Sequence, residues 1–497
     1  MNDKIVIPIC DKTATSDFTA EISMPDYEPE VRRLLRVGVT LTPPMPFSDA
    51  SRVGMNGEII YDILYAAGDG GLYSTRAREG YELTEARKGA EIGADMLALI
   101  CEVTPESLIS RATAPRKLSI RCKLRGRMRG FAETELGERL TYVENPSAIQ
   151  RLQGVSEYAH ILPSALESIQ ISDDFNPELP SGVSGDLRII CHEVAVAVES
   201  IDPGRDEAVV KGTAHLSLLA TVDDGESTPF KIHRKIPFAE VINAEGLSPL
   251  CECTATACCI DADFTLDENK ISCELELAVK LDAQETRRAE YTRDLFSTEV
   301  ESQTTTKRYE FPISERAFSG NFTASLYEPL EGMGFEADAE IIDANAAATV
   351  KNIEFDRSKW AVTGETAVNF ITKKDGEYGT KEVKLPFRYE VDGKIGVPVL
   401  CECAVAPIAL RTKLDSGRLS IDCELHATGR ICVKDSLEAL DEGVFGETLD
   451  KDSAITVCFP ASGGSIWDVA KRYHVTTDSI IAKNPNANTH IPQFLLV

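Results

Sequence analysis

Hydrophobic and polar residues alternate with a period of two through much of the chain. In residues 57–65 and 270–277 almost every second side chain is apolar, which places the apolar set on one face of a β-strand. Turn-forming residues end such stretches, as Gly-Asp-Gly does at 68–70 and Asp-Gly at 375–376. The pattern predicts a mainly β protein built from sandwich or barrel-like units, with one short helix expected at 30–35.

Four landmarks recur with a period of about 150 residues. In order they are a Tyr/Phe-x-Pro string, a glycine that opens an alternating stretch, a Cys-Glu pair and a second cysteine about 21 residues later. The glycines are Gly57, Gly212 and Gly364, the Cys-Glu cysteines are Cys101, Cys251 and Cys401, and the second cysteines are Cys122, Cys273 and Cys423. The repeat predicts three β-rich modules at 1–160, 161–308 and 309–450.

The segment 454–497 has a different pattern. A short strand is expected at 455–459, and Ser465 is placed to cap a helix with an apolar face. A second short helix follows, and a closing strand is expected at 495–497. The order is strand, helix, helix, strand. Trp467 is predicted to be a core aromatic. Lys471 and the arginine after it are predicted to form a solvated face, with docking of an acidic partner as the alternative.

Charge and composition narrow the classes of function. The 497 residues include 80 acidic and 52 basic side chains, a net charge of -28, which argues against binding to nucleic acid or to anionic lipid. No apolar run reaches the length of a membrane span, and the first residues do not resemble a signal peptide. We therefore expect a cytoplasmic protein whose 14 cysteines are thiols.

The cysteines also allow a metal hypothesis. Four of five nearby thiols could in principle bind zinc, namely Cys251, Cys253, Cys258, Cys259 and Cys273. The other modules do not keep this set, and the repeated cysteines alternate with Ile and Leu, so core packing is favoured over a metal site. No metal and no cofactor is expected.

Catalytic patterns are missing at the level of sequence. The histidines keep no common position across the repeats, and no phosphate-binding glycine loop occurs. We therefore predict no catalytic residues and no enzymatic activity.

Residues 463–473, Gly-Gly-Ser-Ile-Trp-Asp-Val-Ala-Lys-Arg-Tyr, resemble the start of a LysM domain, and 480–485 and 491–492 continue the resemblance. LysM domains bind N-acetylglucosamine of peptidoglycan or chitin in a shallow groove. Carried over by the resemblance, the groove comprises Gly463, Gly464, Ser465, Ile466, Asn484, Pro485, Asn486 and Ile491. Gly464 stands where the family usually has Asp, a change that suits a protein-binding role.

The three repeats resemble SPOCS domains, through residues 24–31 and 57–65 and the turn that follows. Tandem SPOCS domains with a C-terminal LysM domain are the arrangement of SipL/SpoVID-like spore-coat morphogenetic proteins. The resemblance implies a non-enzymatic scaffold in the mother cell that anchors a SpoIVA-like coat ATPase and other coat proteins at the forespore surface. Two alternatives stay open: a peptidoglycan-binding LysM protein of the cell wall or spore cortex, and a wall hydrolase with a catalytic module.

Overall fold

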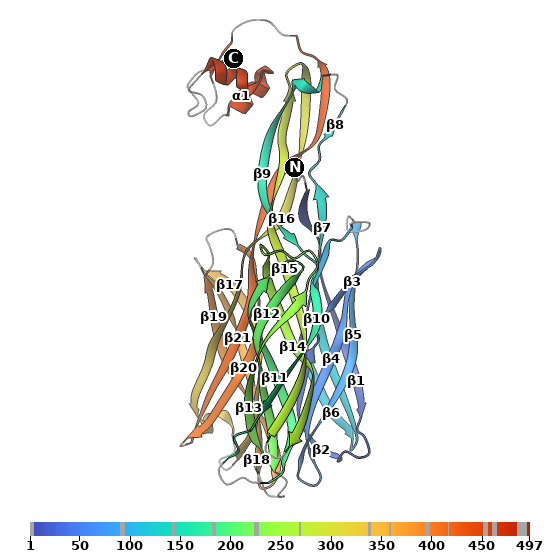
Figure 1. Cartoon of the computed structure of the whole chain (residues 1–497), viewed down its shortest axis with the longest axis vertical. Coiled ribbons are helices and arrows are strands. Elements are labelled where there is room, and N and C mark those ends of the chain that lie inside the picture. Colours follow the sequence, from blue (N-terminus) through green and yellow to red (C-terminus); the bar gives the residue numbers. More distant parts are fainter. Residues whose placement is uncertain are drawn as a thin grey trace.

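The chain is mainly β, as the alternating pattern predicted. In the computed structural model 79% of the chain is strand and two helices are short. The structure describes residues 4–89, 95–141, 145–180, 185–222, 228–267, 270–335, 339–356, 359–392, 398–415, 417–450, 456–459, 465–484 and 495–497. Long sandwiches lie side by side in the lower part of the molecule, and a narrow stalk rises above them to the C-terminal helices (Figure 1).

One strand topology occurs three times. In each copy the first, sixth and fifth strands form one sheet, with the sixth in the middle, and the second, third and fourth form a facing sheet. In module 1 the sheets are β1 (Lys4–Ser23), β7 (Lys117–Glu135) and β6 (Ala98–Ala114), and β2 (Val31–Leu41), β4 (Arg52–Ala67) and β5 (Leu72–Ala86) with the short β3 (Met45–Ser48).

The other two modules have the same order. Module 2 consists of β10 (Ala165–Phe175), β15 (Lys270–Ser297) and β14 (Glu252–Asp267), facing β11 (Leu187–Pro203), β12 (Glu207–Val222) and β13 (Phe230–Asn243). Module 3 consists of β16 (Val300–Pro329), β21 (Arg418–Thr448) and β20 (Pro398–Asp415), facing β17 (Glu340–Asp356), β18 (Lys359–Lys374) and β19 (Glu377–Asp392).

The second cysteine of each repeat lies in the sandwich core, as its position among Ile and Leu predicted. Cys122, Cys273 and Cys423 are on the central strands β7, β15 and β21 and are essentially inaccessible to solvent. Burial raises the pKa of the Cys122 and Cys423 thiols to about 11. These groups are therefore protonated, apolar core elements at neutral pH.

The Cys-Glu cysteines of the repeats do not occupy equivalent places, although they are 150 residues apart. Cys101 pairs with the residue six positions beyond Cys122. Cys401 pairs with the residue eight positions beyond Cys423, and Cys251 precedes the first residue of β14. The turn that joins the two strands lies at a different distance from the cysteines in each module, and β6 has one more bulge between its Cys-Glu cysteine and the turn than β14 or β20, so a count along the sequence does not give the register.

The helix expected at 30–35 is wrong, because β2 runs through Val31–Leu41 and pairs with β4. Ladder pairing and burial of one face outweigh the local helix preference of this stretch.

The repeated glycines lie inside strands, five residues after each begins, and not at their openings. Gly57, Gly212 and Gly364 each pair across the ladder with an aromatic residue: Tyr81, Phe238 and Phe387. A Cβ at Gly364 would overlap the carbonyl oxygen of Thr349 and lie 2.5 Å from the Phe387 ring. Because the glycine has no side chain, the aromatic ring of the partner strand can pack directly against its backbone.

We expect Gly364→Ala to lower the free energy of unfolding by about 2–3 kcal/mol, because the extra carbon collides with backbone as well as with the ring. Gly80→Ala is the matched control, since the nearest atom to a Cβ there is 4.0 Å away; its effect should stay within about 1 kcal/mol. Urea unfolding measures both. Equal effects of the two substitutions would refute this role of the glycine.

The stalk combines strands that extend out of modules 2 and 3. The C-terminal half of β15 pairs with β9 (Ile149–Ile161). The first half of β16 pairs with the last half of β21, and β21 also pairs with the short β8 (Arg139–Leu140). Apolar side chains join the two ribbons: Leu140, Ile149, Leu295, Leu440 and Phe445. The repeat-based boundaries at 160/161 and 308/309 fall within β9 and β16.

The three modules form a closed ring, here called the ring. The fourth strand of each module contacts the second strand of the next: β5 with β11, β13 with β17, and β19 with β2. A cation seven residues beyond each repeated core cysteine also reaches into another module. The three contacts are Arg129 with Glu402 at 2.5 Å, Lys280 with the Cys101 carbonyl at 3.0 Å, and Arg430 with Gln284 at 3.3 Å.

The centre of the ring is formed by equivalent β-bulges. Leu35, Ile190 and Ile342 are the bulged residues of β2, β11 and β17, and they belong to one buried cluster. The next residue in each strand is polar: Arg36, Cys191 and Asp343. Arg36 forms an ion pair with Asp343 and lies 3.6 Å from the Cys191 sulfur, and Lys231 and Glu193 complete the charge network.

Five histidines have lowered pKa values, mainly because desolvation by the surrounding protein disfavours the charged ring. They are His160, His192, His215, His233 and His426. Four of them are partly or fully buried, whereas the side chain of His233 is exposed. Two of them bridge modules in the neutral form. His192 Nε2 lies 2.7 Å from the Arg76 guanidinium, and His426 Nε2 lies 3.0 Å from the Val198 carbonyl oxygen.

We predict that the protein loses stability as pH falls below the ordinary histidine pKa of 6.5. A lowered pKa means that the unfolded chain takes up protons first, so acid favours unfolding. Glu193 and Glu402, whose pKa values burial raises, act in the opposite direction but are fewer. The urea midpoint at about pH 5.5 should lie below that at about pH 7.5. His192→Gln should reduce the difference, and equal midpoints in the wild type would contradict the prediction.

Candidate functional site

The C-terminal domain is small and its helices are capped by their own sequence. Its elements are β22 (Val457–Cys458), α1 (Ile466–Tyr473), α2 (Thr477–Lys483) and β23 (Leu495–Leu496), and β22 pairs with β23. Ser465 and Asp468 form a reciprocal capping box at the start of α1, with Oγ of Ser465 accepting from the Asp468 amide at 3.1 Å. Neither helix of the described chain has the length and apolar content needed to cross a bilayer.

Three of the eight residues predicted for the groove are described. Gly463, Gly464, Pro485, Asn486 and Ile491 lie outside the described residues. Of the others, Ser465 is the exposed helix cap and Ile466 packs partly into the domain core.

Asn484 joins α2 to the last strand. Its Nδ2 donates to the carbonyl oxygens of Ile480 and Leu496, both at 2.8 Å, and its Oδ1 accepts from the Leu496 amide at 3.0 Å. Both ends of the amide are therefore used within the domain. A ligand that needed this side chain would have to displace those hydrogen bonds.

A carboxylate of the stalk, Asp294 in β15, accepts several of the described polar contacts between this domain and the body. It accepts from the Trp467 indole Nε1 at 2.9 Å and from Lys471 Nζ at 2.6 and 2.8 Å. Thr304 and the Leu295 amide also donate to it. Burial raises the pKa of Asp294, but the bonds from Lys471 and Trp467 outweigh this and keep it below its usual value.

Apolar packing surrounds this carboxylate. The Phe296 ring is fully buried and meets the Trp467 ring edge-on, with centroids 4.9 Å apart. His474, at the end of α1, has its Nδ1 3.1 Å from the Ser297 carbonyl oxygen. We call the group Asp294, Phe296, Trp467, Lys471 and His474 the clasp. It fixes α1 against the tip of the stalk, at the end of the molecule away from the ring (Figure 1).

The sequence patterns singled out Trp467 and Lys471 of α1, but not the clasp residues of the stalk. Trp467 is buried, as predicted for a core aromatic. The acidic partner of Lys471 is Asp294 of the same chain, 177 residues earlier. Asp294 itself was missed, because an acidic residue in an alternating strand carries no signal of its own. Only the fold brings it to α1.

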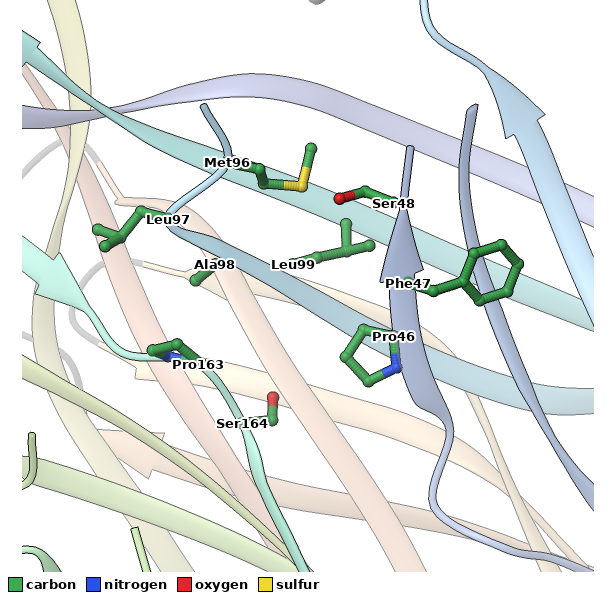
Figure 2. Close-up of a pocket in the computed structure, with 9 residues that line it drawn as sticks. All are labelled: Pro46, Phe47, Ser48, Met96, Leu97, Ala98, Leu99, Pro163 and Ser164. Atoms are coloured by element: carbon green, nitrogen blue, oxygen red, sulfur yellow. The ribbon is translucent and has the colours of Figure 1, made fainter. Parts of the chain in front are cut away.

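A shallow pocket of about 170 Å³ opens at the upper rim of module 1 (Figure 2). Its lining comes from β3, the start of β6 and residues 163–164, and consists of Pro46, Phe47, Ser48, Met96, Leu97, Ala98, Leu99, Pro163 and Ser164. Ser164 is held by Asp282, whose carboxylate accepts from its hydroxyl at 2.5 Å. This lining contains no titratable side chain; it combines apolar side chains with the hydroxyl groups of Ser48 and Ser164.

Within the described residues, no group of three or more His, Cys, Asp or Glu side chains is arranged so that it could hold a metal ion. The cysteines of the zinc hypothesis are bonded elsewhere. Cys258 donates to the Leu41 carbonyl of module 1, and Cys259 to the Asp261 carbonyl. Burial raises the pKa of both thiols to about 12, which opposes the thiolate form that zinc requires.

Comparison with known proteins adds no relative: no family model, no curated protein and no solved structure matches the chain.

Proposed function

We propose that the chain is a non-enzymatic scaffold of spore-coat assembly, in which SPOCS-type modules and a LysM-type C-terminal domain bind different coat components. The single observation that carries the proposal is the clasp, together with the resemblance in sequence. The C-terminal domain is fixed at one end of the stalk, and the three-module ring lies at the other end. One chain would therefore present two separate binding surfaces. Such an arrangement gives avidity between weak contacts.

The partner-binding surface of the C-terminal domain would lie away from the clasp. Val457 of β22 and Phe459, the residue that follows this strand, have side chains that are 49% and 74% exposed. An exposed aromatic beside an apolar neighbour on a short strand suits a protein contact. Because Asn484 and Ser465 are committed to bonds within the domain, protein binding is favoured here over glycan binding.

A pull-down with the purified full chain tests this proposal. We expect capture of a SpoIVA-like coat ATPase and no retention on insoluble peptidoglycan. Val457→Ser with Phe459→Ser should weaken capture at least about tenfold, a loss of about 1.4 kcal/mol. Val444→Ser, an exposed apolar substitution on the stalk, is the matched control. Retention on peptidoglycan without capture of the ATPase would favour the alternative, a glycan-binding LysM protein.

A further inference from the structure

The outer face of module 1 carries an uninterrupted row of cations. Five successive outward positions of β7 are Arg121, Lys123, Arg125, Arg127 and Arg129, between inward residues that fill the core. We call these five residues the cationic row. Arg121 and Arg125 are the most exposed, at 57% and 59% of the side chain. Such a row stands out in a chain whose net charge is -28.

The fold does not require these charges. In β15, the equivalent strand of module 2, the residues one and three positions beyond the core cysteine are Glu274 and Glu276. In β21 of module 3, the residues on either side of the core cysteine are Asp422 and Glu424. The outward side of the central strand is therefore basic in module 1 and acidic in the other two modules, and in module 1 the carboxylates of Asp11, Asp17, Glu102 and Glu106 lie beside it on β1 and β6.

Every cation of the cationic row already has a carboxylate partner within the chain. Arg127 pairs with Asp11 at 2.7 Å, and Arg129 pairs with Glu102 at 3.3 Å and with Glu402 of module 3 at 2.5 Å. A single carboxylate, Glu106, serves both Lys123 at 2.7 Å and Arg125 at 3.1 Å. Arg121 pairs with Asp17 at 2.9 Å, and both side chains are open to solvent. Exposed pairs of this kind are worth at most about 1 kcal/mol, so these cations can take a second acid at little cost.

Module 2 has two neighbouring acidic side chains on its outer face. Asp263 of β14 lies directly opposite Glu274 of β15, so two exposed carboxylates are neighbours across the ladder. Within the described residues neither has an ion-pair partner. Like charges in this position destabilise a sheet unless a cation lies between them.

We propose that the cationic row of one chain binds the acidic face of module 2, around Asp263 and Glu274, on a second copy of the chain. Outward side chains along both strands are spaced by about 6.7 Å, so the two rows match in repeat. Since the two faces are different, the contact is head-to-tail and leaves a free face at each end. Such a contact links molecules into open chains or closed rings, and the proposal holds whether or not the coat assignment is correct.

Sedimentation velocity of the full chain at about 0.01 M and about 1 M salt tests the proposal, because the screening length falls from about 30 Å to about 3 Å. We expect concentration-dependent association at low salt that is lost at high salt. Arg121→Glu with Arg125→Glu should weaken it at least about tenfold. Asp263→Lys with Glu274→Lys should do the same. An equimolar mixture of the two double variants should restore association as alternating molecules of the two variants, because the row of each then meets a face of opposite charge on the other.

The control is Arg139→Glu with Arg288→Glu, the same charge change on exposed stalk arginines, and it should leave association intact. Circular dichroism verifies that each variant is folded. A wild-type monomer at low salt would overturn the proposal, even if it bound a polyanion such as heparin, because the row would then serve another partner. Association that survives the row variant, or a mixture that fails to restore it, would also overturn it.

Discussion

Asp294→Ala should detach the C-terminal domain from the stalk. The substitution removes the acceptor for both the Trp467 indole and the Lys471 ammonium, and it leaves these donors facing an apolar ring. Loss of one partner of a half-buried charged pair costs about 3 kcal/mol, which shifts the docking equilibrium about a hundredfold. The effect can be read from Trp467 itself, since the chain has only 2 Trp residues.

Trp467 emission is expected to move to longer wavelength in Asp294→Ala when Trp360 is replaced by Phe in every protein compared. Asp441→Ala is the matched control, since it removes a stalk carboxylate whose partner is the exposed Arg139, and it should leave the emission unchanged. A Trp467 emission that is identical in Asp294→Ala and in the wild-type background would mean that the clasp does not hold the domain.

Breaking the charge network at the ring centre should be the most destabilising change in the body. Asp343 is fully buried and bonded to Arg36 and Lys231, which come from modules 1 and 2. Arg36→Leu or Asp343→Leu alone leaves an uncompensated buried charge, and each should lower the free energy of unfolding by about 3–5 kcal/mol. The double variant removes one charge of each sign and should recover most of the loss.

Urea unfolding of the four proteins measures this coupling. Arg288→Leu with Glu157→Leu removes an exposed stalk pair and serves as the control, with an effect of at most about 1 kcal/mol. Additive losses in the Arg36/Asp343 double variant would show that the two residues do not interact.

Local patterns were sufficient for the β class and for the buried core cysteines, but not for strand pairing or for the assembly of modules. The position of Cys122 between Ile120 and Leu124 predicted a buried strand, since the period of two depends only on neighbouring residues. Gly364 was found by its repeat but its role was not, because the Phe387 ring that needs the space is on another strand. The helix expected at 30–35 failed for the same reason: pairing with β4 is not visible locally.

The residues at the ring centre show why the sequence patterns could not predict how the modules assemble. Arg36, Cys191 and Asp343 occupy the same place in three modules but differ in charge: one is basic, one is a thiol and one is acidic. A repeat search finds what copies share, whereas a closed asymmetric network needs residues that differ. Asp294 and its partners Trp467 and Lys471 are likewise unrelated in sequence and meet only through the stalk.

Imaging of the fluorescently tagged full chain in a sporulating bacterium tests the proposed scaffold most directly. The account predicts a signal that surrounds the forespore in the wild type and a diffuse mother-cell signal for the Val457→Ser, Phe459→Ser variant, with normal localisation of Val444→Ser. A wild-type signal spread through the mother cell, or confined to the peripheral wall, would contradict it.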